Sequence, residues 1–173
     1  AGCFNGQVIT WNVSTGDVEN QFFHEKLLAL AEIPGTNQIL AGSTEKLVRV
    51  KNRYIGDNYR VFAGHTTSTT MGVGFSADGR YVVSGGTEAL TRMWTRTNAV
   101  PHFVLPGHGA GPEVATFSPD GTKILTTFGA PVFSAQLWNA QSGVVERDFF
   151  GHTGWLLTAV FSPYGQRIAT GAQ

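Results

Sequence analysis

The chain has 173 residues and balances twelve Lys and Arg against twelve Asp and Glu, so no net charge draws it toward nucleic acid or an anionic membrane. Cys3 is the single cysteine, which excludes an internal disulfide and a cysteine-rich zinc site, and we expect a reducing, cytoplasmic compartment. No apolar run approaches the roughly 18 residues that a membrane span needs. The 22 glycines instead predict many tight turns.

Three sequence markers recur in the same order along the chain, with a period of about 40 to 45 residues. The first is a histidine, preceded by glycine in the last three cases, at His24, His65, His108 and His152. The second is a position shortly before each histidine, held by Trp11, Lys51, Trp94 and Trp138. The third is Phe-Ser-x-x-Gly, which begins at Phe75, Phe117 and Phe161. This order and period indicate a repeat architecture.

The strand pattern follows the repeats in chain order. Residues 1–23 hold two predicted strands, the units 24–63, 65–106 and 108–150 hold four each, and 152–173 holds two. The clearest examples are the apolar run from Leu156 to Phe161, its Ser/Pro/Gly turn, and the alternating stretch from Ala135 to Trp138. No window has a convincing helical period. We therefore predict an all-β chain of short antiparallel strands.

The Gly-His pairs, the Phe-Ser-Pro-Asp-Gly turn at 117–121 and the recurring Trp-Asn resemble the WD-repeat β-propeller family. The resemblance covers essentially the whole chain. It implies four-stranded antiparallel blades around a channel, here three complete blades and two complementary half blades. The family's Trp-Asp is replaced throughout, by Trp11-Asn12, Lys51-Asn52, Trp94-Thr95 and Trp138-Asn139.

The same resemblance implies a buried hydrogen-bonded brace in each blade, made by the histidine, a Ser or Thr of the second strand, and the Trp. The brace residues by position are His65, Ser84 and Trp94, then His108, Thr126 and Trp138, then His152 and Thr170, with Trp11 in the first Trp position. A buried imidazole and a buried indole N–H each need a partner. The second repeat departs, because Ala41 and Lys51 stand in two of these positions, and we expect Lys51 to extend its amine to water.

Catalytic chemistry has no support in the sequence. Four histidines belong to the repeat, and His102 is expected on the surface of an outer strand. No phosphate loop, nucleophile elbow or zinc spacing is present. We expect neither enzymatic activity nor a cofactor or metal.

Partner binding is expected where loops emerge at one end of the blades. The candidates there are Trp155, Leu157, Met71, Glu113 and Phe128. Large aromatic residues dominate binding hot spots, yet Trp155 packed against a neighbouring blade is an equal alternative.

Our functional hypothesis is a non-catalytic scaffold that presents a propeller face to a protein or peptide, without nucleic acid or membrane partners. The half blades predict completion of the ring, either by the remainder of a longer propeller or by strand exchange in a homodimer with eight blades. The alternative is a sensory or substrate-positioning propeller within a larger enzyme or multidomain protein. A self-assembling unit with no other partner is a third reading.

Overall fold

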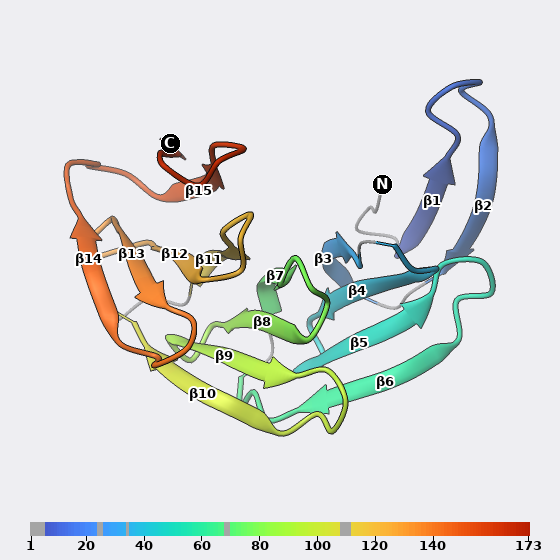
Figure 1. The fold of residues 1–173 in the computed structure, drawn as a ribbon, viewed down its shortest axis with the longest axis horizontal. Coiled ribbons are helices and arrows are strands. Elements are labelled where there is room, and N and C mark those ends of the chain that lie inside the picture. The colour runs from blue at the N-terminus through green and yellow to red at the C-terminus, as the bar shows by residue number, and fades with distance from the viewer. Residues whose placement is uncertain (1–5, 24–25, 34, 68–69, 108–111) are drawn as a thin grey trace.

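The computed structural model shows an arc of small antiparallel sheets arranged side by side, and it describes residues 6–23, 26–33, 35–67, 70–107 and 112–173 (Figure 1). The strands of this part of the chain are β1 (Gln7–Trp11), β2 (Val18–Phe23), β3 (Leu27–Glu32), β4 (Gln38–Ser43), β5 (Leu47–Asn52), β6 (Asn58–Ala63), β7 (Thr70–Phe75), β8 (Tyr81–Gly86), β9 (Leu90–Thr95), β10 (Pro101–Pro106), β11 (Pro112–Phe117), β12 (Lys123–Phe128), β13 (Ser134–Asn139), β14 (Val145–Phe149), β15 (Leu156–Phe161) and β16 (Ile168–Ala172).

Sheet topology confirms the predicted all-β fold class. Three sheets have four strands, in the orders β3-β4-β5-β6, β7-β8-β9-β10 and β11-β12-β13-β14, and two sheets have two strands, β1-β2 and β15-β16. Each strand pairs antiparallel with its neighbour in sequence, so every sheet is a meander that can be joined by short turns. The molecule is thus a partial propeller of blades.

The repeated Phe-Ser-x-x-Gly motif forms the turn between the first two strands of a blade. In the β7–β8 turn the hydroxyl of Ser76 donates to Asp78 Oδ1 at 2.6 Å and accepts from the amide of Tyr81 at 3.0 Å. Gly79 supplies the left-handed backbone conformation with φ of 67°, which glycine adopts without steric cost. Ser118 and Asp120 repeat the 2.6 Å contact in the β11–β12 turn.

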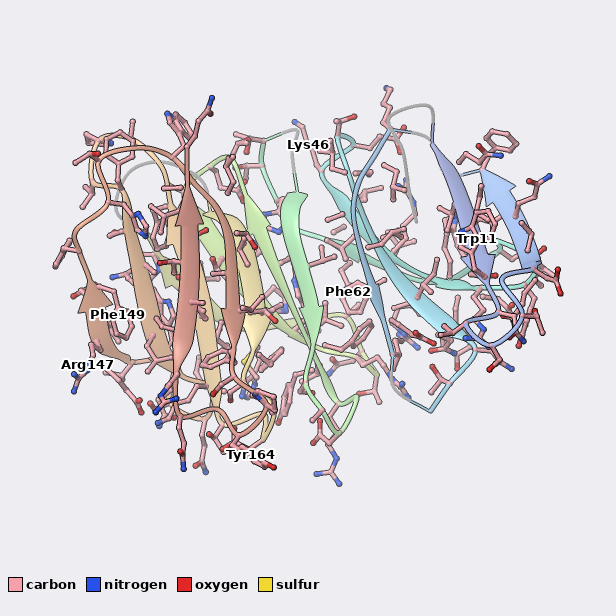
Figure 2. The ribbon with its side chains drawn as sticks, turned by 90° about the horizontal axis from the view of Figure 1, so that it is seen from above. Trp11, Lys46, Phe62, Arg147, Phe149 and Tyr164 are labelled. Atoms are coloured by element: carbon pink, nitrogen blue, oxygen red, sulfur yellow. The ribbon has the colours of Figure 1, made fainter. Side chains whose placement is uncertain are left out.

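The hydrophobic core is divided into layers between successive blades. One layer joins the β3–β6 and β7–β10 blades, where Phe62 of β6 meets Trp94 of β9 with ring centroids 5.7 Å apart. Figure 2 shows Phe62 between the two ends of the molecule, with Trp11 on β1 near one end and Phe149 on β14 near the other. Both faces of a central blade are therefore covered, which explains the runs of buried residues in β4, β8 and β12.

The inner strands β7 and β11 approach each other closely at one glycine. A Cβ added to Gly72 would overlap the backbone of Val114 and Ala115 on β11. Glycine is thus required where the backbones of two blades nearly touch.

Candidate functional site

A chain of hydrogen bonds braces the β7–β10 blade. Trp94 Nε1 donates to Ser84 Oγ at 2.8 Å, His65 Nε2 lies 2.8 Å from the same oxygen, and His65 Nδ1 lies 2.7 Å from Glu88 Oε1. A carboxylate can only accept, so His65 donates from Nδ1, its Nε2 accepts the Ser84 hydroxyl, and that hydroxyl accepts from the indole. The donors therefore follow one another from Trp94 through Ser84 and His65 to Glu88, and each buried donor has an acceptor.

Glu88 is the polar centre of this blade. It also accepts from the Thr67 hydroxyl at 2.7 Å and from Arg92 Nη1 at 2.7 Å. Burial lowers the pKa of the His65 imidazole, against the opposing hydrogen bond to Glu88, so the ring is held neutral. Burial acts to raise the pKa of Glu88, but its hydrogen bonds to Thr67 and His65 prevail and lower it. The favoured state is a neutral imidazole beside a charged carboxylate.

Two glycines make room for this brace. A Cβ on Gly64 would lie 2.9 Å from Trp94 Cη2, and a Cβ on Gly86 would overlap both His65 Nδ1 and the carboxylate of Glu88. Gly64, the glycine of the Gly-His pair, therefore leaves the space that the indole ring of Trp94 occupies.

The other predicted brace residues are only partly brought together. Trp138 Nε1 donates to Thr126 Oγ1 at 2.9 Å, and His152 Nε2 lies 2.8 Å from Thr170 Oγ1. His108 lies outside the described residues. Trp11 is 51% exposed, and no hydrogen bond to its indole is present among the described residues, where β1 pairs only with β2. In a complete blade the strand before the one with the Trp carries the Ser or Thr hydroxyl. The two-stranded β1–β2 sheet has no such strand among the described residues.

The position of the Lys51 side chain differs from the prediction. We expected its amine to reach water, but the residue is only 8% exposed and Lys51 Nζ donates to the carbonyl of Gly56 at 2.8 Å. Burial, reinforced by Arg49, lowers the pKa of the ammonium group. The side chain therefore lies against the β5–β6 turn, where this carbonyl accepts its hydrogen bond.

Among the candidate rim residues, the structure describes the side chains of Trp155, Leu157 and Phe128. Trp155 is 43% exposed and Leu157 is 57% exposed, at the start of β15. The indole of Trp155 lies against the neighbouring blade, because a Cβ on Gly129 would overlap its six-membered ring. One face of the Trp155 ring therefore packs against the neighbouring blade while the rest stays open, and partner binding by Trp155 stays a prediction.

Phe128 is wrong as a binding residue, since it is fully buried. Its ring packs over Gly107, where an added Cβ would overlap it, at the end of a strand that is covered on both faces. Met71 and Glu113 lie in β7 and β11, but their side chains are outside what the structure describes.

Within the described ranges, no group of three His, Cys, Asp or Glu residues is placed to hold a metal ion. The same part of the chain has no helix of the length and apolar character that crossing a membrane requires.

The family pattern described as WD domain, G-beta repeat matches residues 56–95 and 143–173. In these two stretches the chain is similar to WD-repeat proteins. One chain in the crystal structure of a mitotic checkpoint complex superposes on it with a TM-score of 0.84 over 98% of this chain and 52% of that one, at 18% sequence identity, which supports the propeller fold.

Curated WD-repeat relatives are longer than this chain. Nuclear distribution protein nudF of Emericella nidulans is 26% identical over 76% of this chain and 34% of its own length. Guanine nucleotide-binding protein subunit beta-1 of Drosophila melanogaster is 29% identical over 61% of this chain and 32% of its own. Apoptotic protease-activating factor 1 of Homo sapiens is 23% identical over 84% of this chain and 12% of its own. The chain spans about a third or less of each. WD-repeat propellers are generally interaction modules without catalytic activity.

Proposed function

We propose that this chain is a non-catalytic scaffold that presents one end of its propeller blades to a protein or peptide partner. The observation that carries the proposal is the pair Trp155 and Leu157, two large apolar side chains left 43% and 57% exposed at one end of β15. Aromatic anchors held by their neighbours dominate the energetics of protein interfaces. The packing of the Trp155 ring on Gly129 fixes its orientation before a partner arrives.

The test is to substitute Trp155→Ala and to measure affinity for a partner that has been captured with the wild type and then purified. We expect a loss of about 2 kcal/mol or more in binding free energy, as for truncation of a hot-spot aromatic residue. The matched control is Tyr164→Ala, which removes an aromatic ring that is 89% exposed in the β15–β16 turn, at the other end of the blade. Equal losses from both substitutions, or none from Trp155→Ala, would refute the assignment of this surface.

We propose further that two copies complete each other by strand exchange. Among the described residues β1 pairs only with β2, and β16 pairs only with β15. A pocket of about 380 Å³ lies beside β1, lined by apolar side chains that include Val8, Leu30 and Ile39. The β15–β16 hairpin of a second copy would supply the two inner strands that β1–β2 lack and would fill this pocket.

Three complete blades and one composite blade per copy give an eight-bladed ring with twofold closure, within the range of about 4 to 8 blades that propellers adopt. Light scattering then gives twice the monomer mass of 18.6 kDa. Val160→Lys, which charges the open face of β15, is expected to abolish the dimer, whereas Tyr164→Lys in the neighbouring turn is expected to leave it intact. A stable monomer of the wild type would refute self-completion.

The alternative is that the chain forms the propeller part of a larger multidomain protein. It is favoured by the short share of each relative that the chain spans, 12% for the human apoptotic protease-activating factor. A monomer that becomes stable only when further propeller sequence is attached would support this alternative.

A further inference from the structure

Two arginines line a pocket at the end of the β7–β10 blade that lies opposite the brace. The pocket measures about 320 Å³ and lies between the β7–β8 and β9–β10 turns. Its walls carry Arg80, Arg96, Asp78, Tyr81, Thr95 and Thr97. Guanidinium groups and hydroxyls are the side-chain groups that bind phosphate and carboxylate oxygens.

The fold places the two arginines together. The amide of Arg96 donates to the carbonyl of Arg80 at 2.8 Å, which ties the two turns to each other. The guanidinium of Arg96 lies over the residue before Arg80, since its Nη1 is 3.6 Å from where a Cβ on Gly79 would stand. The two residues therefore line one pocket, and a hydrogen bond joins their backbones.

Arg96 has no carboxylate partner among the described residues, in contrast to the corresponding arginine of the preceding blade. There the amide of Arg53 donates to Asn37 at 2.9 Å, which is the same backbone contact, but Arg53 Nη1 bonds Glu32 Oε1 at 2.9 Å. The position of Glu32 in the repeat is held by Phe75 in the β7–β10 blade. Arg96 therefore lacks the internal counterion that Arg53 has.

Asp78 is the one carboxylate among the residues that line this pocket. Hydrogen bonds from the Ser76 hydroxyl and from the Arg80 amide lower the pKa of Asp78 and hold it ionised. Arg80 Nε lies 3.7 Å from Asp78 Oδ2, with side chains that are largely exposed. Two guanidinium groups against one carboxylate leave the pocket with a net positive charge, although the whole chain has none.

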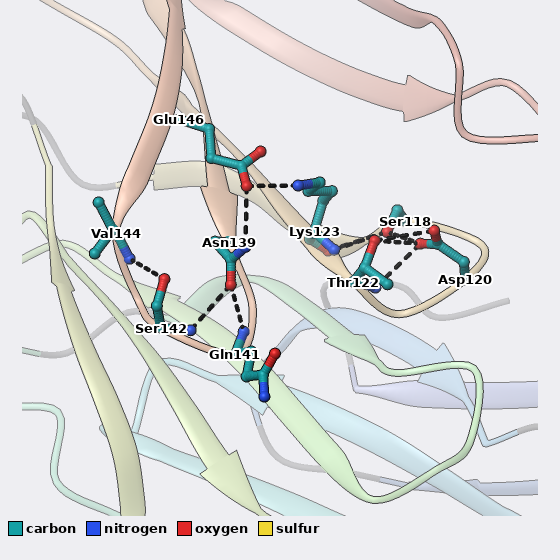
Figure 3. Close-up of polar contacts among 9 residues, drawn as sticks. All are labelled: Ser118, Asp120, Thr122, Lys123, Asn139, Gln141, Ser142, Val144 and Glu146. Atoms are coloured by element: carbon teal, nitrogen blue, oxygen red, sulfur yellow. Dashed lines mark hydrogen bonds and ion pairs between the residues drawn. The ribbon is translucent and has the colours of Figure 1, made fainter.

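The next blade has the same turns without this charge. The amide of Ala140 donates to the carbonyl of Thr122 at 2.9 Å, so Thr122 and Ala140 take the places of Arg80 and Arg96. Figure 3 shows these turns, in which Glu146 joins Lys123 and Asn139, and Asp120 accepts from Thr122. The polar groups there satisfy one another.

We propose that the pocket of Arg80 and Arg96 binds a phosphorylated side chain of a protein partner. A phosphate carries close to two negative charges and three acceptor oxygens, which match two guanidinium forks, whereas one fork already satisfies a carboxylate. The inference rests on the proposed scaffold function, but it concerns the opposite end of the blades from Trp155. It therefore assigns the chain a second contact with its partner.

The experiment measures fluorescence polarisation of degenerate peptides with a fixed central phosphothreonine, against the same peptides with threonine. Wild type is expected to bind the phosphorylated peptides at least about tenfold more tightly, since hydrogen bonds to charged groups are the strong ones. A double variant, Arg80→Thr with Arg96→Ala, introduces the residues that the next blade has at these positions. It is expected to bind phosphorylated and unphosphorylated peptides equally. Asp78→Asn is expected to strengthen binding, because it removes the opposing charge.

The matched control is Arg147→Thr with Arg167→Ala, which removes the same charge from exposed positions and is expected to bind like wild type. Thermal melts verify that every variant is folded. Equal binding by wild type and the Arg80/Arg96 variant overturns the proposal. Inorganic phosphate that binds as tightly as the phosphopeptides also overturns it, in favour of a site for a free anion. Either result leaves the Trp155 measurement untouched, so the two proposals fail separately.

Discussion

The β7–β10 and β3–β6 blades share their strand order but stabilise their centres differently. In the first, Ser84 and Trp94 take part in a satisfied chain of buried polar groups. In the second, Ala41 and Lys51 occupy the same positions, and the ammonium of Lys51 bonds a carbonyl of its own turn. The comparison shows that the meander and its apolar layers are sufficient for a blade, while the brace is an addition that depends on a matched set of residues.

Removing the indole at the centre of the braced blade is the most severe test of this comparison. Trp94 is fully buried and contacts Phe62 of the preceding blade, so we expect Trp94→Ala to cost about 3 to 5 kcal/mol in unfolding free energy. Urea unfolding measures the change. Trp11→Ala is the matched control, because the same ring is half exposed there, and a loss of similar size would mean that burial does not decide the effect.

Ser84→Ala tests the hydrogen bonds without removing volume. It leaves the indole N–H of Trp94 and Nε2 of His65 without a buried partner, and we expect a loss of about 1 to 3 kcal/mol. Thr126→Val makes the corresponding change in the β11–β14 blade, where the hydroxyl accepts from Trp138. A melting temperature that stays at the wild-type value in Ser84→Ala would show that the brace contributes nothing.

The unbraced blade offers the converse experiment, a double-mutant cycle of Ala41→Ser and Lys51→Trp. Lys51→Trp alone buries an indole N–H opposite Ala41, while the pair restores the hydroxyl that this N–H needs. We expect a favourable coupling of about 1 kcal/mol between the two substitutions. Strictly additive effects would mean that the two positions do not meet as Ser84 and Trp94 do.

The smallest effect concerns pH. Burial places the folded-state pKa of His65 below its ordinary value of 6.5, so the folded chain takes up fewer protons than the unfolded chain as pH falls. The neutral His65 therefore contributes its full stabilisation above pH 6.5, and this contribution declines as the pH falls below 6.5. Unfolding free energy at about pH 7.5 and about pH 5.5 measures the loss, which His65→Gln should reduce. The control His102→Gln removes an exposed histidine, and an equal reduction there would contradict the role of His65.

Much of the fold could be predicted because its markers are local. The Phe-Ser-x-x-Gly turn is a contact between neighbours in sequence, as Ser76 and Asp78 show, and a period repeated along the chain locates the strands between turns. Polar pairs such as Trp138 and Thr126 sit in adjacent strands, so their separation in the repeat indicates that they meet.

Side-chain direction at the ends of strands could not be predicted in this way. Phe128 is the last residue of β12, next to a turn, so the sequence suggested an exposed ring. In the structure the ring packs over Gly107 and is buried. Lys51 found an acceptor in the adjacent turn that sequence spacing does not indicate. The unpaired charge of Arg96 could not be read from the net composition either, because it depends on which repeat carries a carboxylate at the position of Glu32.

The glycine at position 72 lets two neighbouring blades approach closely at their inner strands. Because the backbones of β7 and β11 nearly touch there, the blades diverge from a narrow inner radius, as Figure 1 shows. A side chain at this position would act as a spacer near the axis and would flatten the curvature between these two blades. Gly72 therefore permits the close inner spacing of these two blades.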